Sequence, residues 1–334
     1  MENFNNMYDP FDNMTFSNNN CFLCGCKLSK DNRTDEHVYP KWLQKKFKLW
    51  DRELSLLNNT LIKYKNLKIP CCKSCNEKMS GLLEKPIERA VSSGYEQFIL
   101  LDKKIIFLWL NKLSYGILFK ELSLKLKREN PNRGSIYSEE DIKEKRMQYT
   151  FLQTIISDTK YIGTPYSILI FKIDPCNEEE YWAHDNPNFK TFFIRMNDIG
   201  IIANLMDNGF NENFFLGIPD MEKFTHYILH PIQFLELCAR FLYKCSLFFK
   251  DPFYIISSNE TDNKANTIIS QSLSGIAYNK WNQKNYAEVL SFYLKPYKLS
   301  FSDIYENGVV ASWLQNSDGS FNNIVKNYHS KNDN

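Results

Sequence analysis

Two pairs of cysteines lie at the ends of one stretch of the chain, residues 21 to 84, and their spacing is typical of metal ligands. Cys21 and Cys24 form one Cys-x-x-Cys pair, and Cys72 and Cys75 form the other. A two-residue spacer lets both sulfurs of a pair face one point, so two such pairs can surround a zinc ion tetrahedrally. The sequence therefore predicts a structural zinc, which contributes on the order of 10 kcal/mol to the folding of a short, loop-rich segment.

Five further cysteines do not fit this spacing. Cys26 and Cys71 flank the pairs and leave the choice of ligands open, but we favour the two pairs because they share one spacing. The alternative is that all these thiols are metal-free core residues. Cys176, Cys238 and Cys245 stand apart in the sequence, and we expect them to be buried free thiols.

The stretch between the pairs resembles the HNH endonucleases, whose ββα-metal finger is often braced by a zinc held by two cysteine pairs. The first motif of that family is an acidic residue and His, followed by a hydrophobic residue and often Pro, and here it reads Glu36-His37-Val38-Tyr39-Pro40. The last motif is Cys-x-x-Cys followed by His or Asn, and here it ends Cys75-Asn76. The resemblance covers about residues 21 to 90. Glu36 replaces the commoner Asp, and Asn76 replaces the second His.

The chemistry of phosphodiester cleavage requires these residue types. A neutral imidazole, with an ordinary pKa of about 6.5, can take a proton from water, so His37 is the expected general base. Carboxylate and amide oxygens suit a hard divalent ion, Mg²⁺ or Mn²⁺, which makes Glu36 and Asn76 the expected ligands of a catalytic ion. The resemblance implies that Asn66 holds the His37 loop in position. Glu84, two helical turns after Asn76, is a candidate extra ligand.

Each of these residues also has a structural interpretation. A single His in a globular protein is more often a hydrogen-bonded structural residue than a catalyst, and His37 is favoured as a catalyst by its position between the cysteine pairs. Asn76 is also suited to capping a helix that begins near Glu77, because Asn is a common N-cap residue.

The charge of the chain is unevenly distributed. Residues 27–90 hold 15 Lys or Arg against 8 Asp or Glu, whereas residues 151–334 hold 15 against 20. A basic finger beside an acidic remainder fits a phosphate-binding end, with double-stranded DNA as the expected partner, although a solvated surface gives the same pattern. The lysines expected to contact phosphates are Lys41, Lys45, Lys46, Lys73 and Lys78.

Length and hydrophobic pattern predict an α+β protein with several parts. A chain of 334 residues with 43% apolar content suits one large or two modest domains. We expect a flexible arm at 1–20, an HNH finger at 21–97, a helical connector at 98–149 and an α+β domain with a mostly antiparallel sheet at 150–329. In the last domain the expected strands are 166–173, 190–197, 199–207 and 253–258, and the expected helices are 230–249, 264–274 and 283–293.

The remaining expectations concern location and role. The polar first twenty residues do not form a signal peptide, no apolar run is long enough to span a membrane, and nine cysteines without such a leader indicate the reducing cytoplasm. By analogy with the family, a nuclease joined to a second module suits bacterial defence against foreign DNA. That module would sense a ligand, select a substrate, or bind a second copy or a defence-system partner. The alternatives are a non-catalytic zinc-knuckle module that binds nucleic acid and a protein-interaction module.

Overall fold

The computed structural model describes residues 8–11, 16–122, 124, 135–176, 180–212, 222–249, 252–258, 266–270 and 278–325. The chain divides into two compact units, each built from separate segments. The first unit comprises residues 1–92, 101–163 and 254–270, and the second comprises residues 93–100, 164–253 and 271–334. The mixture of helices and strands confirms the predicted α+β class.

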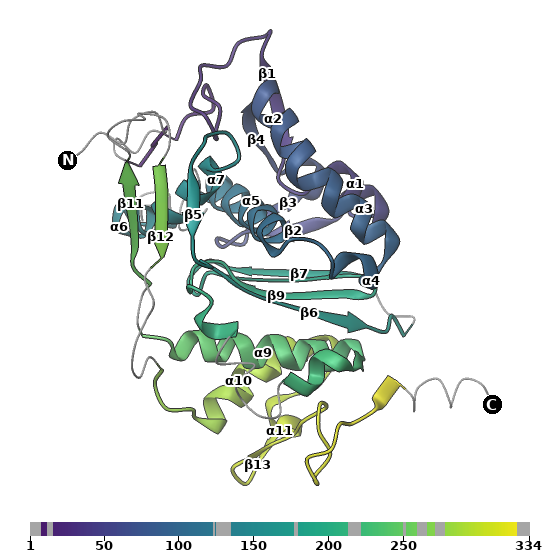
Figure 1. Ribbon diagram of the computed structural model, residues 1–334. Coiled ribbons are helices and arrows are strands. Elements are labelled where there is room, and N and C mark those ends of the chain that lie inside the picture. The colour runs from purple at the N-terminus through teal and green to yellow at the C-terminus, as the bar shows by residue number, and fades with distance from the viewer. Residues whose placement is uncertain are drawn as a thin grey trace. The chain divides into compact units, whose positions relative to one another are not determined.

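The first unit combines small sheets with several helices (Figure 1). Its elements are β1 (Arg33–His37), α1 (Lys41–Lys46), β2 (Glu53–Ser55), β3 (Leu61–Lys63), η1 (Tyr64–Asn66), β4 (Lys68–Cys72), α2 (Lys73–Met79), the π-helical η2 (Ser80–Glu84), α3 (Lys85–Ser93), α5 (Lys103–Glu121), α6 (Glu139–Glu144), α7 (Arg146–Gln153), β5 (Lys160–Ile162), β11 (Tyr254–Ser258) and β12 (Asn266–Ser270).

An antiparallel pair of strands and the helix that follows it carry the residues singled out in the sequence. Strand β1 pairs with β4 so that Arg33 faces Cys72 and His37 faces Lys68. Helix α2 begins directly after β4, with Cys72 as its N-cap. Asn76 therefore lies inside the helix, so the expectation that it caps a helix starting near Glu77 is wrong.

One almost unbroken helical rod runs from α2 through η2 to α3. Pro86 is the second residue of α3, where its missing N–H costs little. The irregularity lies just before it, in the π-helical turn that holds Glu84. π-Helical turns are frequent at functional sites because they redirect one side chain.

Helix α5 is buried on nearly every side, so it forms the centre of the first unit. Its buried positions include the charged residue Lys112 among Trp109, Leu113 and other apolar side chains. This helix, expected in a connector, belongs to the same unit as β1 and β4. The arm expected to be flexible also packs on this unit where it is described: Phe11 is buried against Tyr149, and Asp9 pairs with Arg146 at 2.5 Å.

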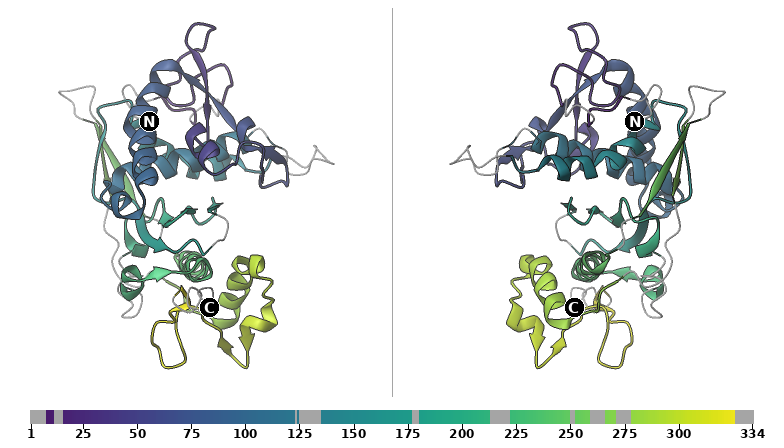
Figure 2. Two further views of the ribbon diagram at one scale, coloured as in Figure 1. Left: turned by 90° about the vertical axis from the view of Figure 1, so that its right-hand side faces the viewer. Right: turned by 90° about the vertical axis from the view of Figure 1, so that its left-hand side faces the viewer.

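The second unit is built on one five-stranded sheet of order β10-β6-β9-β8-β7, covered by α9 (Figures 1 and 2). All neighbouring strands are antiparallel except β10 and β6. Its elements are α4 (Tyr95–Phe98), β6 (Ser167–Ile173), β7 (Tyr181–Asn186), β8 (Thr191–Met196), β9 (Ile199–Asn204), η4 (Glu222–His226), β10 (Ile228–Leu229), α9 (Pro231–Leu247), α10 (Gln283–Tyr293), η5 (Lys295–Tyr297), α11 (Phe301–Ile304), β13 (Tyr305–Glu306) and β14 (Val309–Val310).

The core of the second unit lies between the sheet, α9 and α10. Phe193 of β8 and Phe241 of α9 are fully buried there, with ring centroids 6.1 Å apart. Gly200 lets α9 approach closely, because a Cβ at that position would lie 2.6 Å from the ring of Phe234. The strands expected at 166–173, 190–197 and 199–207 are present as β6, β8 and β9.

One expected helix and the expected extent of the last domain differ from the fold. The helix predicted at 264–274 is wrong where the chain is described, because Asn266–Ser270 is strand β12. Strand β12 lies between β11 and β5, and both it and β11 belong to the first unit, although we expected residues 150–329 to form one domain.

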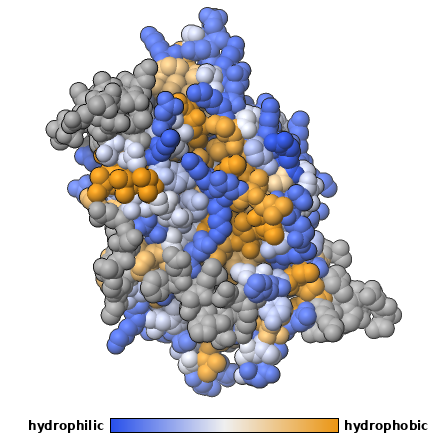
Figure 3. All heavy atoms as spheres, viewed as in Figure 1, coloured by the Kyte–Doolittle hydropathy of each residue, from blue (hydrophilic) through white to orange (hydrophobic). Residues whose placement is uncertain are grey.

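The face shown in Figure 3 carries hydrophobic patches among hydrophilic side chains. Among the helices that the structure describes, none combines the length and the apolar character needed to cross a membrane.

Candidate functional site

The sulfurs of Cys21, Cys24, Cys72 and Cys75 converge on one point. All four lie within 4.8 Å of one another, and the Cys24 and Cys72 sulfurs are 3.8 Å apart. Sulfurs that bind one zinc at about 2.3 Å lie about 3.8 Å from each other, so this spacing fits a tetrahedral ion. The four cysteines predicted as ligands therefore form one cluster that could hold a metal ion such as zinc.

The two halves of the cluster are built differently. In the first, the N–H of Gly25 donates to the carbonyl of Cys21, and Gly25 has a φ of 71°, which favours glycine. In the second, the helix start supplies the geometry: Cys72 is the N-cap of α2, and its sulfur accepts the N–H of Cys75 at 3.5 Å. A tight turn thus directs the first two sulfurs, and a helix N-terminus the other two, toward one common point.

Hydrogen bonds among the thiols shift their pKa values in opposite directions. Hydrogen bonding to Cys21 raises the pKa of Cys24 to about 12 and that of Cys75 further, while these bonds lower the pKa of Cys21. Because a zinc ion binds thiolates, its binding would have to release the protons that remain on the cluster. Cys71 approaches Cys21 at 4.0 Å but lies outside the four, because adjacent residues of a strand point to opposite faces.

Glu36 and Glu84 meet at one buried cation, the ammonium of Lys112. Lys112 pairs with Glu36, lies 2.9 Å from Oε1 of Glu84, and donates to the carbonyls of His37 at 2.8 Å and Val38 at 3.0 Å. An ammonium has three N–H donors, so these four acceptors satisfy it fully. The loop that carries Glu36 and His37 is therefore fixed to α5.

Charge and burial compete in this cluster. Burial raises the pKa of Glu36 to about 7, although the ammonium of Lys112 acts against this rise. Burial also opposes the charge of Lys112, but the carboxylates of Glu36 and Glu84 outweigh it and raise the pKa of Lys112. Lys112 is thus a permanent cation between two carboxylates.

The imidazole of His37 lies at the end of β1 and stacks on Trp50, with ring centroids 5.9 Å apart. Its Nε2 is buried and has no hydrogen-bond partner among the described residues. Burial, followed by the charges of Lys68 and Lys41, lowers the pKa of His37 to about 4. The ring is therefore neutral near pH 7.

The remaining predicted residues lie around this centre. Asn76 is half-buried and donates from Nδ2 to Oγ1 of Thr34 at 3.2 Å, on the strand face that also carries Glu36. Asn66 is exposed at the end of η1, just before the strand that pairs with β1. The five lysines expected to contact phosphates, Lys41, Lys45, Lys46, Lys73 and Lys78, are all exposed.

Sequence reasoning missed three residues of this site. Lys112 had a signal, because a lysine within an otherwise apolar helix needs a buried partner. Lys68 faces His37 across the strand pair, and Trp50 stacks on it, but both positions depend on strand register and loop packing.

No family model, no curated protein and no solved structure matches the chain.

Proposed function

We propose that the first unit is a metal-dependent nuclease of the HNH type that hydrolyses phosphodiester bonds, with double-stranded DNA as its substrate. The order β1, β4, α2, braced by a four-cysteine cluster, is the order of a ββα finger. A contribution to bacterial defence against foreign DNA is part of the same proposal.

The observation that carries this proposal is the state of His37. A neutral imidazole with an unpartnered, buried Nε2 is an available proton acceptor at the end of β1. A pKa of about 4 makes it a weak base in the free protein. A phosphate bound near Lys41 and Lys68 would bring negative charge to the ring and raise that pKa toward the working pH. Trp50, which is 36% exposed and stacks on the ring, is the neighbour whose movement would admit water.

The residues around Lys112 fit a catalytic divalent ion only in part. Glu36 and Glu84 each use Oε1 for Lys112, so either would hold Mg²⁺ or Mn²⁺ through its second oxygen, with the amide oxygen of Asn76 as a further ligand. Of the two carboxylates, Glu84 is the more open to solvent, because its side chain is 17% exposed and that of Glu36 is 6% exposed. When bound, such an ion stabilises negative charge on the phosphate and on the leaving oxygen.

Lys112 also favours a second candidate function. Its ammonium already pairs with both carboxylates, so a folded zinc module without a catalytic ion has a cation beside each of them. In that case the exposed lysines would bind nucleic acid without cleaving it.

A plasmid-nicking assay with Mg²⁺ or Mn²⁺ separates the two functions. The native chain is compared with His37→Ala and with His226→Ala, which removes an exposed histidine of the second unit. The nuclease proposal expects His37→Ala to lose at least about 100-fold in cleavage rate, the usual contribution of a general base, with zinc content unchanged. The control should cleave normally. Equal cleavage by all three proteins would contradict the role of His37. DNA binding without cleavage by the native chain would favour the non-catalytic module.

A further inference from the structure

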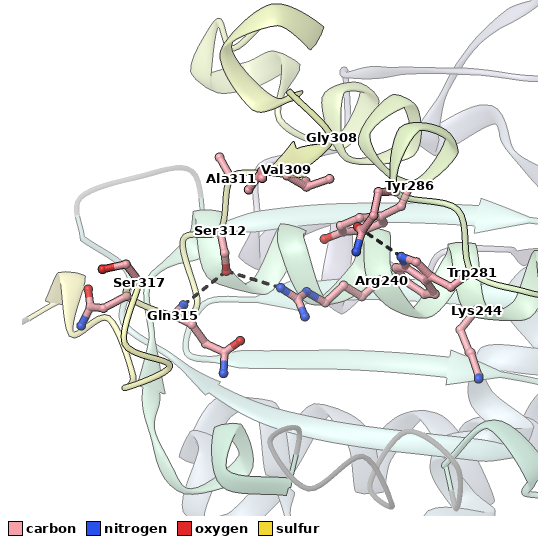
Figure 4. A pocket seen from close by; sticks show the side chains of 13 residues that line it. Arg240, Lys244, Trp281, Tyr286, Gly308, Val309, Ala311, Ser312, Gln315 and Ser317 are labelled. Carbon is pink, nitrogen blue, oxygen red and sulfur yellow. Dashed lines mark hydrogen bonds between the residues drawn. The ribbon is translucent and has the colours of Figure 1, made fainter. Parts of the chain in front are cut away.

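The second unit contains a cavity of about 710 Å³ between α9, α10 and the segment 308–317 (Figure 4). This volume lies within the range of about 300–1,000 Å³ that small-molecule sites occupy. Its lining combines the cations Arg240 and Lys244, the aromatic rings of Trp281 and Tyr286, and amide or hydroxyl groups such as those of Gln315 and Ser312. No carboxylate lines the cavity among the described residues.

One wall of the cavity is held in place by a buried carboxylate behind it. Glu236, fully buried in α9, accepts hydrogen bonds from the N–H of Trp313 at 2.6 Å and of Leu314 at 3.1 Å. It also binds Arg240 at 2.6 Å and the hydroxyl of Ser312 at 2.8 Å. These bonds fix the segment after β14 to α9, so the wall is preformed. They also neutralise the charge of Arg240.

In the described part of the chain, the second cation of the cavity, Lys244, has no carboxylate partner of the kind that Arg240 has in Glu236. The described residues include no carboxylate within ion-pair distance of Lys244, and its ammonium lies over the ring of Tyr278, 3.7 Å from the centroid. Partial burial lowers the pKa of Lys244, which means that its ammonium is poorly solvated. A half-buried cation without an anion beside it favours an anionic ligand.

The aromatic side of the cavity favours a planar group. Trp281 is 41% exposed, although its indole is large and apolar. Tyr243 and Tyr286 support the indole at centroid distances of 4.6 Å and 5.0 Å, so it is held in position at the cavity. An exposed, supported aromatic ring is a suitable stacking partner for a nucleobase.

We propose that this cavity binds a nucleotide, with the phosphate at Lys244, the base against Trp281, and ribose or base-edge contacts to Gln315. The inference goes beyond the nuclease proposal and does not depend on it, because every residue involved belongs to the second unit. A cation, an aromatic platform and several hydrogen-bonding side chains together match the three parts of a nucleotide.

Isothermal titration of the full-length protein tests this. The probes are AMP, GMP, CMP and UMP, with the matching nucleosides and inorganic phosphate as comparisons. At least one nucleotide should bind, and at least about tenfold more tightly than its nucleoside, because a charge-assisted contact contributes about 1.5–3 kcal/mol. Inorganic phosphate should bind no better than the nucleoside. Absence of nucleotide binding at millimolar concentration, or equal binding of nucleotide and nucleoside, would overturn the proposal.

Four variants assign the binding to this cavity. Lys244→Met should weaken nucleotide binding about tenfold and leave nucleoside binding unchanged, whereas Lys244→Arg should retain most of the affinity. Trp281→Ala should weaken nucleotide and nucleoside alike. Lys284→Met is the matched control, because Lys284 is exposed on α10 outside the cavity. Unchanged nucleotide affinity in both Lys244→Met and Trp281→Ala would also overturn the proposal.

Discussion

The two units are stabilised by different means. Around β1 and β4 the first unit has a two-stranded sheet and short helices, and four sulfurs tie its loops together. The second unit has a five-stranded sheet whose strands β8 and β9 are buried along their whole length, with α9 packed on the sheet. A two-stranded sheet buries little apolar surface by itself, so we expect the region around β1 and β4 to depend on a bound metal, whereas the second unit depends on its core.

Loss of the metal should have the largest effect of the changes that test this difference between the units. Cys72→Ser should unfold the region around β1, β4 and α2, because it removes a metal ligand and a structural zinc contributes on the order of 10 kcal/mol. The serine hydroxyl can still cap α2 in place of the Cys72 sulfur, so the loss would report on the metal and not on the cap. Zinc content and hydrogen exchange followed peptide by peptide would show lost protection in β1 and β4 and retained protection in β8 and β9.

Cys26→Ser is the matched control for this change. Cys26 is close in sequence but outside the four-sulfur cluster, so its variant should keep one zinc and normal protection. Full zinc occupancy in Cys72→Ser would contradict the ligand assignment.

The converse test removes part of the core of the second unit. Phe193→Ala should cost about 3–5 kcal/mol, because it leaves a cavity beside Phe241 and Tyr293. The loss should appear as faster exchange in β8 and β9 with unchanged zinc content. If zinc were lost as well, the two units would not be stabilised separately.

The sequence could predict a region where its residues interact with near neighbours in the chain, and could not where they interact with residues far along the chain. The cysteine cluster was predictable because each Cys-x-x-Cys turn is local, whether a glycine turn or a helix N-cap. The cavity of the second unit carries no motif, because Lys244, Trp281 and Ser312 meet only when α9, α10 and the β14 segment pack together. Strand β12 was read as a helix for a similar reason, since its partners β5 and β11 are set by the tertiary fold.

In the candidate nuclease site the sequence also identified residues without identifying their partners, even within a single motif. Glu36 and His37 were found from the sequence, but the partner of Glu36 is Lys112, far along the chain on α5. Nothing near Glu36 signals that an ammonium occupies its carboxylate. Asn76 was expected at a catalytic ion, and its hydrogen bond to Thr34 depends on how α2 packs on β1.

Removing Lys112 tests whether charge as well as zinc holds the first unit together. Lys112→Met should cost about 3 kcal/mol, because it leaves Glu36 and Glu84 buried without their cation, and protonation of Glu36 relieves only part of this cost. Urea denaturation measures the loss, and adding Glu36→Gln should restore part of it. Lys120→Met, on the same helix but half-buried, should cost less. Equal losses in the two lysine variants would show that the carboxylates do not need Lys112.

The smallest effect concerns the pH dependence of the first unit. Above pH 6.5 the His37 ring is neutral in the folded and the unfolded chain. Because the folded pKa is lowered to about 4, only the unfolded chain binds a proton between about pH 6.5 and 4, so this histidine makes stability fall as the pH drops through that window. Glu36 acts in the opposite direction: with its pKa raised to about 7, it contributes stability at low pH that is lost as the pH rises through 7.

The contribution of His37 can be isolated from that of Glu36 by comparing variants. From pH 6.5 to 4.5 the native chain should lose roughly 1–2 kcal/mol more than His37→Gln, since each unit of pKa difference corresponds to about 1.4 kcal/mol and the ring is incompletely shielded. Urea denaturation at several pH values gives this difference, and His226→Gln, which removes an exposed histidine, should follow the native curve. Parallel curves for the native chain and His37→Gln would mean that the imidazole titrates normally. The first unit would then lack the neutral, desolvated base on which its proposed chemistry depends.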